Sequence, residues 1–357
     1  MFLDYKNYRN VWNFFLILVF FLFSASPYAL EPKNPRSVFN QEYDAVLLGL
    51  IQKAKVSIYA SHFTFSTQED ICNEIVQSLR EAAKRGVAVK LFLEGKKKGA
   101  KDKNIKAEKI LKEAGIQVVL NASRRVAHAK LFVVDEEWVL SGSTNISHSS
   151  MKNNNEANLL LKSPQIAQTL QKYIKSLMEN SDREIVVESK AENQIQAITD
   201  KSFFSYALDM IQNAQKELCI TTYLFDYMPD APDSNISKLF QALVQAHKRG
   251  VKIRIFLEQS SFHFNEHIHE KNLESAQFLY SQGIEGIRFD KPNQISHSKI
   301  ILSDQKKALL GSTNWYCYDI DLGHQVNFII EEKNILAQLA EYFDSLYSAG
   351  VTSCKRL

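Results

Sequence analysis

Features that mark several classes of protein are scarce in this chain of 357 residues. Its four cysteines lie far apart and match no zinc-site spacing. In an oxidising compartment they could form two disulfides in any of three connectivities, and the sequence selects none of them. The net charge of +3 is too small to argue by itself for a nucleic-acid partner. After the N-terminal region, no apolar run is long enough to span a membrane.

The first 29 residues differ from the rest of the chain, which has the mixture of apolar and charged residues typical of a globular protein. Lys6 and Arg9 precede an apolar run over residues 11–25, and a short segment, 26–29, ends it. This order is typical of a secretory signal and predicts an exported protein, periplasmic or secreted. Pro27 stands where a cleavage site prefers a small residue, so an uncleaved N-terminal anchor is the alternative.

One motif occurs twice with the same internal spacing. The first copy comprises His128, Lys130, Asp135, Gly142, Ser143 and Asn145, and the second comprises His297, Lys299, Asp304, Gly311, Ser312 and Asn314. Flanking segments repeat as well, because residues 84–87 and residues 248–251 have identical sequences. The chain is therefore predicted to be a tandem repeat.

Each repeat alternates amphipathic helices with apolar strands. The first is predicted to have helices over 43–53, 71–84, 107–114 and 166–178, and strands over 56–61, 87–93, 131–134, 138–140 and 158–161. The second is predicted to have helices over 204–214, 236–248, 273–282 and 335–347, and strands over 218–223, 251–257, 300–302, 308–310 and 326–330. This pattern predicts an α/β fold of two pseudo-symmetric repeats, each a mixed β-sheet flanked by helices. The expected units are 1–29, 30–180 and 181–357, with the polar segment 179–201 as a link.

The residue types in the motif suit phosphate chemistry. His128 and Lys130 are two positions apart at the start of a strand, so their side chains point to the same side. Ser143 and Asn145 follow a glycine that permits close approach, and they can donate hydrogen bonds to phosphate oxygens. The second copy offers the same groups in His297, Lys299, Ser312 and Asn314. Two histidines could act as nucleophile and acid, while two lysines would stabilise a five-coordinate phosphorus. A purely structural repeat does not explain this recurrence.

Asp135 and Asp304 have a different expected role. Each lies at a strand end beside another polar or charged residue. A turn or a structural ion pair therefore explains them better than proton transfer does, and we expect them to support the site.

The doubled His-x-Lys-(x4)-Asp motif with a trailing Gly-Ser-x-Asn resembles the signature of the phospholipase D superfamily, in particular its compact phospholipase and nuclease-type arm. The resemblance implies one active site at the interface of the two halves, a phosphohistidine intermediate, and no metal or cofactor. It implies catalytic roles for His128, His297, Lys130, Lys299 and Glu156, with His128 assigned as nucleophile. Because both half-sites lie in one chain, a monomer is expected.

Glu156 matches the acidic residue that orients a histidine in this family. We expect it to contact one of the two motif histidines, either that of its own half or that of the other half. The equivalent place in the second copy is Gln325, whose amide can accept a hydrogen bond but carries no charge. The histidine beside Glu156 should therefore keep its proton to higher pH than the one beside Gln325.

The substrate stays open at this point. A phospholipid or membrane surface is favoured by export, whereas a nucleic acid is favoured by a lysine-rich loop over residues 96–106, which could equally be a solvated loop. A non-catalytic phosphate-binding protein is a third interpretation, disfavoured because both motif copies are intact. A loop containing His263, His267 and His269 could hold a metal, although such histidines are usually solvated. The aromatic residues at 63, 65, 223 and 225 are expected mainly in the core.

Overall fold

The computed structural model of the chain describes residues 34–259 and 266–352. Residues 34–357 form one compact unit. The predicted signal segment, His263 and Cys354 lie outside the described residues. Among the helices that are described, none combines the length and apolar character needed to cross a bilayer.

The first repeat forms a seven-stranded mixed sheet in the order β1-β7-β6-β5-β2-β3-β4. Its strands are β1 (Arg36–Phe39), β2 (Ser57–His62), β3 (Ala88–Glu94), β4 (Gln117–Asn121), β5 (Lys130–Val134), β6 (Trp138–Gly142) and β7 (Ala157–Lys162). Its helices are α2 (Glu42–Lys53), α3 (Asp70–Lys84), α4 (Lys101–Lys112), α5 (His148–Lys152) and α6 (Pro164–Glu179). Strands β2, β3 and β4 run parallel, while the pairs from β2 to β1 are antiparallel.

The second repeat forms a matching sheet in the order β11-β10-β9-β12-β13-β14-β8. Its strands are β8 (Ile195–Thr199), β9 (Glu217–Thr222), β10 (Lys252–Leu257), β11 (Ile287–Phe289), β12 (Ile300–Ser303), β13 (Lys307–Gly311) and β14 (Val326–Ile330). Its helices are α7 (Ser202–Asn213), α8 (Asn235–Lys248), α9 (Glu266–Ser281), α10 (Cys317–Asp321) and α11 (Lys333–Ala349). The predicted α/β fold of two pseudo-symmetric repeats is confirmed.

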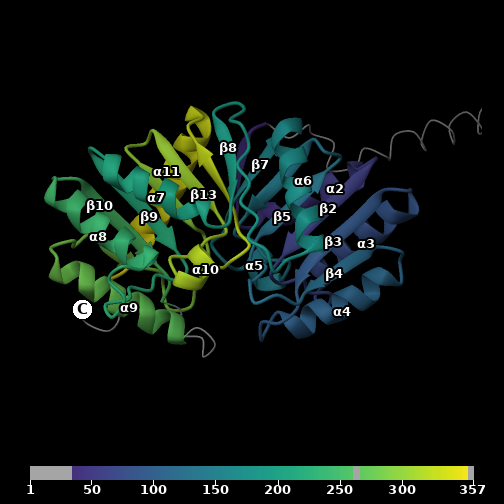
Figure 1. Cartoon of the computed structure of the whole chain (residues 1–357), viewed down its shortest axis with the longest axis horizontal. Helices are drawn as coiled ribbons and strands as arrows, with labels where there is room; N and C mark the ends of the chain where they lie inside the picture. Colours follow the sequence, from purple (N-terminus) through teal and green to yellow (C-terminus); the bar gives the residue numbers. More distant parts are fainter. Residues whose placement is uncertain (1–33, 260–265, 353–357) are drawn as a thin grey trace, which may run out of the picture. The chain divides into compact units, whose positions relative to one another are not determined.

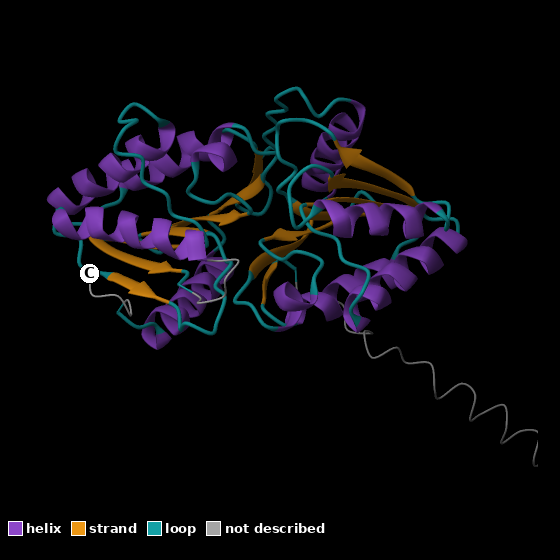
Figure 2. Cartoon of the chain, turned by 90° about the horizontal axis from the view of Figure 1, so that it is seen from below, coloured by secondary structure: helices purple, strands orange, loops and turns teal. Residues whose placement is uncertain are grey.

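Each sheet is covered by helices on both faces, as Figures 1 and 2 show. The outer faces pack against α2, α3 and α4 in the first repeat and against α7, α8 and α9 in the second. The inner faces share a single core with α6 and α11. Helix α6 contacts β8 of the second repeat and α11 contacts β1 of the first, so each repeat helps to complete the other.

The alternation of side chains along the motif strand explains this arrangement. In β5, Leu131 and Val133 enter the shared core, while Phe132 and Val134 enter the outer core of the first repeat. A strand that is buried on both faces is therefore apolar throughout, because alternate residues point into the two different cores. Strands β6 and β7 contact β13, so the motif strands lie where the repeats meet.

The segment expected to link the repeats contains an element that the sequence pattern did not predict. Segment 179–201 contains a strand, β8, which pairs with β14 at the edge of the second sheet. The edge strands β1, β4 and β11 and the short helices α5 and α10 also escaped the sequence patterns. All are three to five residues long, too short for periodicity to separate them from loops.

Candidate active site

The two motif histidines lie where the repeats meet. His128 comes two residues before β5 and His297 three residues before β12, and the backbone of each bonds to the opposite repeat. The N–H groups of His128 and Ala129 donate to the carbonyl oxygen of His324 over 3.0 and 2.8 Å. The N–H of His297 donates to the carbonyl oxygen of Asn155 over 2.8 Å. These crossed bonds fix each imidazole at the interface.

The imidazoles are also held crosswise by side chains. His297 Nδ1 lies 3.0 Å from Glu156 Oε2, and His128 Nδ1 lies 3.1 Å from Gln325 Oε1. A carboxylate only accepts hydrogen bonds, so Nδ1 of His297 carries a hydrogen. The structure thus places both predicted partners beside a histidine, in each case the histidine of the other half.

The two motif serines fix these partners. Ser143 Oγ donates to Glu156 Oε2 over 2.5 Å, and Ser312 Oγ donates to Gln325 Oε1 over 2.7 Å. A hydroxyl has one proton to donate. To donate to a phosphate oxygen, as the sequence predicts, each serine would therefore have to give up its present hydrogen bond.

Lys130 and Lys299 lie buried beside the histidines. Each ammonium group donates to the carbonyl oxygen of the histidine two residues earlier in its own motif. Burial lowers the pKa of Lys299 to about 7, against the opposing charge of Glu156. Burial, and then repulsion from Lys299, lowers the pKa of Lys130 well below its ordinary value. An anion bound beside these two buried lysines would favour their charged forms.

The histidines differ in the charge around them. Burial lowers the pKa of His297 to about 4, although the charge of Glu156 raises it. Burial, followed by repulsion from Lys130, Lys299 and His297, lowers the pKa of His128 well below its ordinary value. Only His297 therefore has a directly bonded carboxylate that favours the protonated ring.

An aromatic ring covers each histidine and its lysine. The Phe63 ring lies edge-on to His128 with centroids 5.0 Å apart, and the Lys130 ammonium lies 5.3 Å from its centre. Tyr223 makes the equivalent contacts with His297 at 4.9 Å and with Lys299 at 5.3 Å. The next aromatic residues, Phe65 and Phe225, are fully buried in the outer cores. The sequence pattern missed this division between site and core.

The glycines of the motif are required by close packing. A Cβ atom on Gly142 would lie 2.5 Å from the Cα of Asn158, and one on Gly311 would lie 2.6 Å from the Cα of Asn327. No side chain fits at such distances, so glycine lets the turn that follows lie against the next strand.

The predicted phosphate-binding asparagines differ between the repeats. Asn145 accepts a hydrogen bond from the backbone of Thr64 over 3.3 Å, whereas Asn314 donates to Asp319 over 2.7 Å. Asp319 also lies 3.6 Å from Nδ1 of His128. The sequence pattern missed this carboxylate because its repeat-equivalent position holds Ser150.

Asp135 and Asp304 lie in tight turns that join neighbouring elements. Asp135 accepts hydrogen bonds from three successive backbone N–H groups, those of Lys55, Val56 and Ser57, over 2.7–2.9 Å. Asp304 accepts the equivalent bonds from residues 215–217 over 2.7–2.9 Å. Both aspartates have positive φ angles, 55° and 52°. Neither carboxylate bonds to a motif histidine in the described structure.

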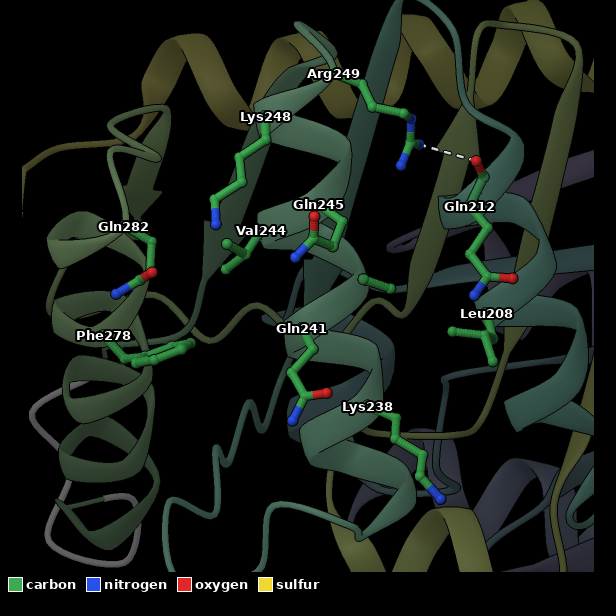
Figure 3. A pocket seen from close by; sticks show the side chains of 11 residues that line it. Leu208, Gln212, Lys238, Gln241, Val244, Gln245, Lys248, Arg249, Phe278 and Gln282 are labelled. Carbon is green, nitrogen blue, oxygen red and sulfur yellow. Dashed lines mark hydrogen bonds between the residues drawn. The ribbon is translucent and has the colours of Figure 1, made fainter.

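A surface hollow of about 690 Å³ lies elsewhere, between α7, α8 and α9. Figure 3 shows that its lining is mostly amide and basic side chains, including Lys238 and Lys248. Arg249 at its edge is already bonded to the backbone carbonyl of Gln212 over 2.9 Å. The hollow contains no motif residue, so the chemistry places the site at the interface instead. Within residues 34–259 and 266–352, no group of acidic, histidine or cysteine side chains is placed to hold a metal.

Comparison with known proteins identifies the family. A family model described as cardiolipin synthase, PLD-like domain, matches residues 47–178 and 207–347. The chain therefore belongs to the phospholipase D superfamily, whose members include phosphodiesterase-type enzymes. This confirms the family predicted from the doubled motif.

The curated relatives match part of their length. The chain is 31% identical over 117 residues to cardiolipin synthase B of Salmonella typhi, which covers 31% of this chain and 27% of that protein. It is also 31% identical over 117 residues to a phospholipase D of Rickettsia prowazekii, covering 33% of this chain and 52% of that protein. A solved phosphatidylserine synthase from Haemophilus influenzae superposes with a TM-score of 0.71 and 15% identity, covering 90% of this chain and 88% of that one. At this identity the likeness shows the fold alone.

Proposed function

We propose that this protein is a phospholipase D-type phosphodiesterase that hydrolyses or transfers phosphatidyl groups through a phosphohistidine intermediate. The observation that carries the proposal is the crossed pairing of His297 with Glu156 and of His128 with Gln325. Each histidine depends on a side chain from the other repeat, so both belong to one reaction centre. The two buried lysines beside them supply the charge that a phosphodiester needs.

In the proposed reaction, Nε2 of His128 attacks phosphorus. A nitrogen–phosphorus bond forms while the bond from phosphorus to the leaving alcohol oxygen breaks. His297 gives its proton to that oxygen and then takes a proton from water or an acceptor alcohol, whose oxygen displaces His128 from phosphorus. Lys130 and Lys299 stabilise the charge on the equatorial oxygens.

The partners of the two histidines support this division of roles. Glu156 favours the protonated form of His297, which suits a proton donor. Gln325 gives His128 a hydrogen bond without a charge, which suits a neutral nucleophile.

A basic surface beside the site supports an anionic substrate. We call it the lysine rim, and its exposed members are Lys96, Lys97, Lys98, Lys101 and Lys106. Glu94 ties the rim to the site, because Oε1 accepts bonds from the N–H groups of Lys96 and Lys97. Its Oε2 accepts the N–H of Ala127, the residue before His128, over 2.8 Å. In the second repeat the corresponding helix, α9, begins with Glu266 instead.

The rim suits a lipid surface better than a nucleic acid. Ile105 lies among the lysines and is 41% exposed, and α4 contains no aromatic residue on which a base could stack. Lysines interleaved with an apolar side chain fit an anionic headgroup layer, whereas single-strand binding relies on aromatic stacking. The names of the relatives, cardiolipin synthase B and phospholipase D, point the same way.

The substrate is tested by incubating the purified protein in EDTA with phosphatidylglycerol vesicles, with and without an alcohol acceptor, and separately with single-stranded DNA. We expect headgroup release, transfer to the added alcohol, and no loss of activity in EDTA. Cleavage of DNA without cleavage of lipid would show that the protein is a nuclease and would refute the lipid proposal. No cleavage of either would favour a phosphate-binding protein.

The lysine rim has its own test. The variant Lys97→Gln/Lys98→Gln should sediment less with anionic vesicles but cleave a soluble short-chain diester at the native rate. The matched control, Lys238→Gln/Lys248→Gln, removes two lysines of the hollow in Figure 3. Equal loss of vesicle binding in the control would show that general charge, and not the rim, attracts the membrane.

We also propose export and a monomeric state. Export would bring a lipid-cleaving site to a membrane surface, and the crossed histidine contacts complete a site within one chain. N-terminal sequencing of the protein from cell fractions tests export and cleavage. Light scattering of the purified protein tests the monomer.

A further inference from the structure

The two repeats differ at one point where their symmetry predicts a match. Position 156 is a glutamate and position 325 a glutamine, although both side chains bond to a histidine and to a motif serine. The amide nitrogen Nε2 of Gln325 is buried and has no hydrogen-bond partner among the described residues. Of these two equivalent positions, only position 156 supplies a carboxylate to the two buried lysines, and buried cations are costly without nearby negative charge.

A second carboxylate lies near the lysines. Asp319 Oδ2 lies 3.6 Å from His128 Nδ1, and the side chain is 11% exposed. It accepts hydrogen bonds from the amide Nδ2 of Asn314 over 2.7 Å and from its backbone N–H over 3.3 Å. Its charge also opposes the loss of charge that burial imposes on Lys130 and Lys299. Glu156 and Asp319 therefore both favour the charged forms of the two lysines.

Asp319 does not occupy the position equivalent to Glu156, which in the second repeat holds Gln325. Asp319 belongs to the short helix α10, and the equivalent position in α5 is Ser150. The backbone N–H of Ser150 is bonded to the hydroxyl of Ser147, which caps α5. The first repeat thus uses this helix only as structure.

We propose that Asp319 is the positioning residue for His128, whose protonated and phosphorylated forms its charge stabilises, while Gln325 holds the ring through a neutral hydrogen bond. The inference rests on the proposed function and deepens it. It means that each histidine has its own carboxylate, Glu156 in direct contact with His297 and Asp319 slightly farther from His128.

The charge around His128 gives the direction of the expected change. The ring is faced by the cations Lys130 and Lys299 and by His297, all of which disfavour its protonation. Asp319 is the carboxylate recorded within ion-pair distance of it in the described structure. Replacing that carboxylate with an amide leaves the repulsion unopposed, so the neutral form of His128 should persist to lower pH.

The test begins with Asp319→Asn, which keeps the shape and removes the charge. For a soluble diester we expect kcat to fall about 10- to 100-fold, the worth of a charged contact, with little change in KM. The acidic limb of the kcat profile should move to lower pH, because that limb reports loss of the neutral nucleophile. Adding Gln325→Glu to the variant restores a carboxylate at His128, and should recover most of the rate and return the limb.

The matched control is Asp321→Asn, two residues away on α10. Its carboxylate accepts a hydrogen bond from Asn235 over 2.7 Å, and no contact of Asp321 with His128 is recorded in the described structure. Both kcat and the profile should stay native in this variant. An unchanged profile in Asp319→Asn, or a folded double variant that recovers nothing, would overturn the inference.

Titration of isotopically labelled histidine by NMR separates this inference from the proposed function. The titration reports the protonation of the His128 ring and does not depend on catalytic activity. A native protein that cleaves no phosphodiester refutes the proposed function. An unchanged His128 titration in Asp319→Asn refutes the role of Asp319, whatever the activity.

Discussion

Replacing Glu156 with glutamine is the most informative single change at the site. Glu156 is fully buried, and Oε2 lies 3.0 Å from His297 Nδ1 and 2.5 Å from Ser143 Oγ. Glutamine keeps the shape and can present an oxygen to both groups. Its NH2 would then face the amide nitrogen of Asn154, which lies 3.3 Å from the other carboxylate oxygen. The Asn154 amide can flip by 180° and present its oxygen to the new NH2 group, so the fold should survive.

The magnitude follows from the distance. Two unit charges 3.0 Å apart attract by about 5 kcal/mol at an effective dielectric constant of 20, which sets an upper limit. A hydrogen bond to a charged group is worth about 1.5–3 kcal/mol, which sets a lower one. At about 1.4 kcal/mol for each factor of ten, we expect kcat to fall about 10²- to 10³-fold.

The assay is the pH dependence of kcat for a soluble phosphodiester. Glu156 raises the pKa of His297, so its loss lowers that pKa and moves the alkaline limb, which reports loss of the protonated acid, to lower pH. The matched control is Glu188→Gln, because Glu188 also accepts hydroxyl bonds, from Ser202 and Tyr206, without any recorded contact with a motif histidine. A native rate and an unmoved alkaline limb in Glu156→Gln would refute the role of this carboxylate.

Other changes test the remaining parts of the site. His128→Ala and His297→Ala should each abolish turnover while circular dichroism stays native, whereas either variant retaining more than about one hundredth of the rate would contradict the two-histidine reaction. Because burial lowers the pKa of Lys299 to about 7, binding of tungstate near pH 7.5 should take up protons, and calorimetry in buffers of different ionisation enthalpy should detect the uptake. Asp135→Ala and Asp304→Ala should each destabilise the fold by about 1–3 kcal/mol, since three backbone N–H groups lose their acceptor, yet denaturant-free kcat should be native.

The repeated motif was sufficient to predict that its two histidines lie where the repeats meet. Identical spacing in two copies of one frame places His128 and His297 at equivalent strand starts, and pseudo-symmetry then brings them to the interface. The same symmetry explains why Glu156 contacts the histidine of the other half. Strands such as β5 were predictable because they are apolar along their whole length.

Features outside the repeated motif could not be predicted in this way. Asp319 acts in a five-residue helix whose counterpart has a serine at that position, so comparison of the copies directs attention away from it. Strand β8 lies between polar segments and gains its partner, β14, only in the folded chain. The roles of Phe63 and Tyr223 depend on which aromatic residue of each loop turns toward the site, and spacing alone does not decide that.

In the proposed reaction the two repeats form one centre, and the phosphoryl group is bound covalently to a histidine during turnover. The most direct measurement is to mix the protein with a phosphorus-labelled phosphatidyl substrate, quench in alkali within the first turnover, and map the labelled peptide by mass spectrometry. We expect label on one histidine, His128. The His128→Ala variant should carry no label, and the His297→Ala variant should keep its label. Turnover by the native protein with no histidine adduct at any quench time would contradict it.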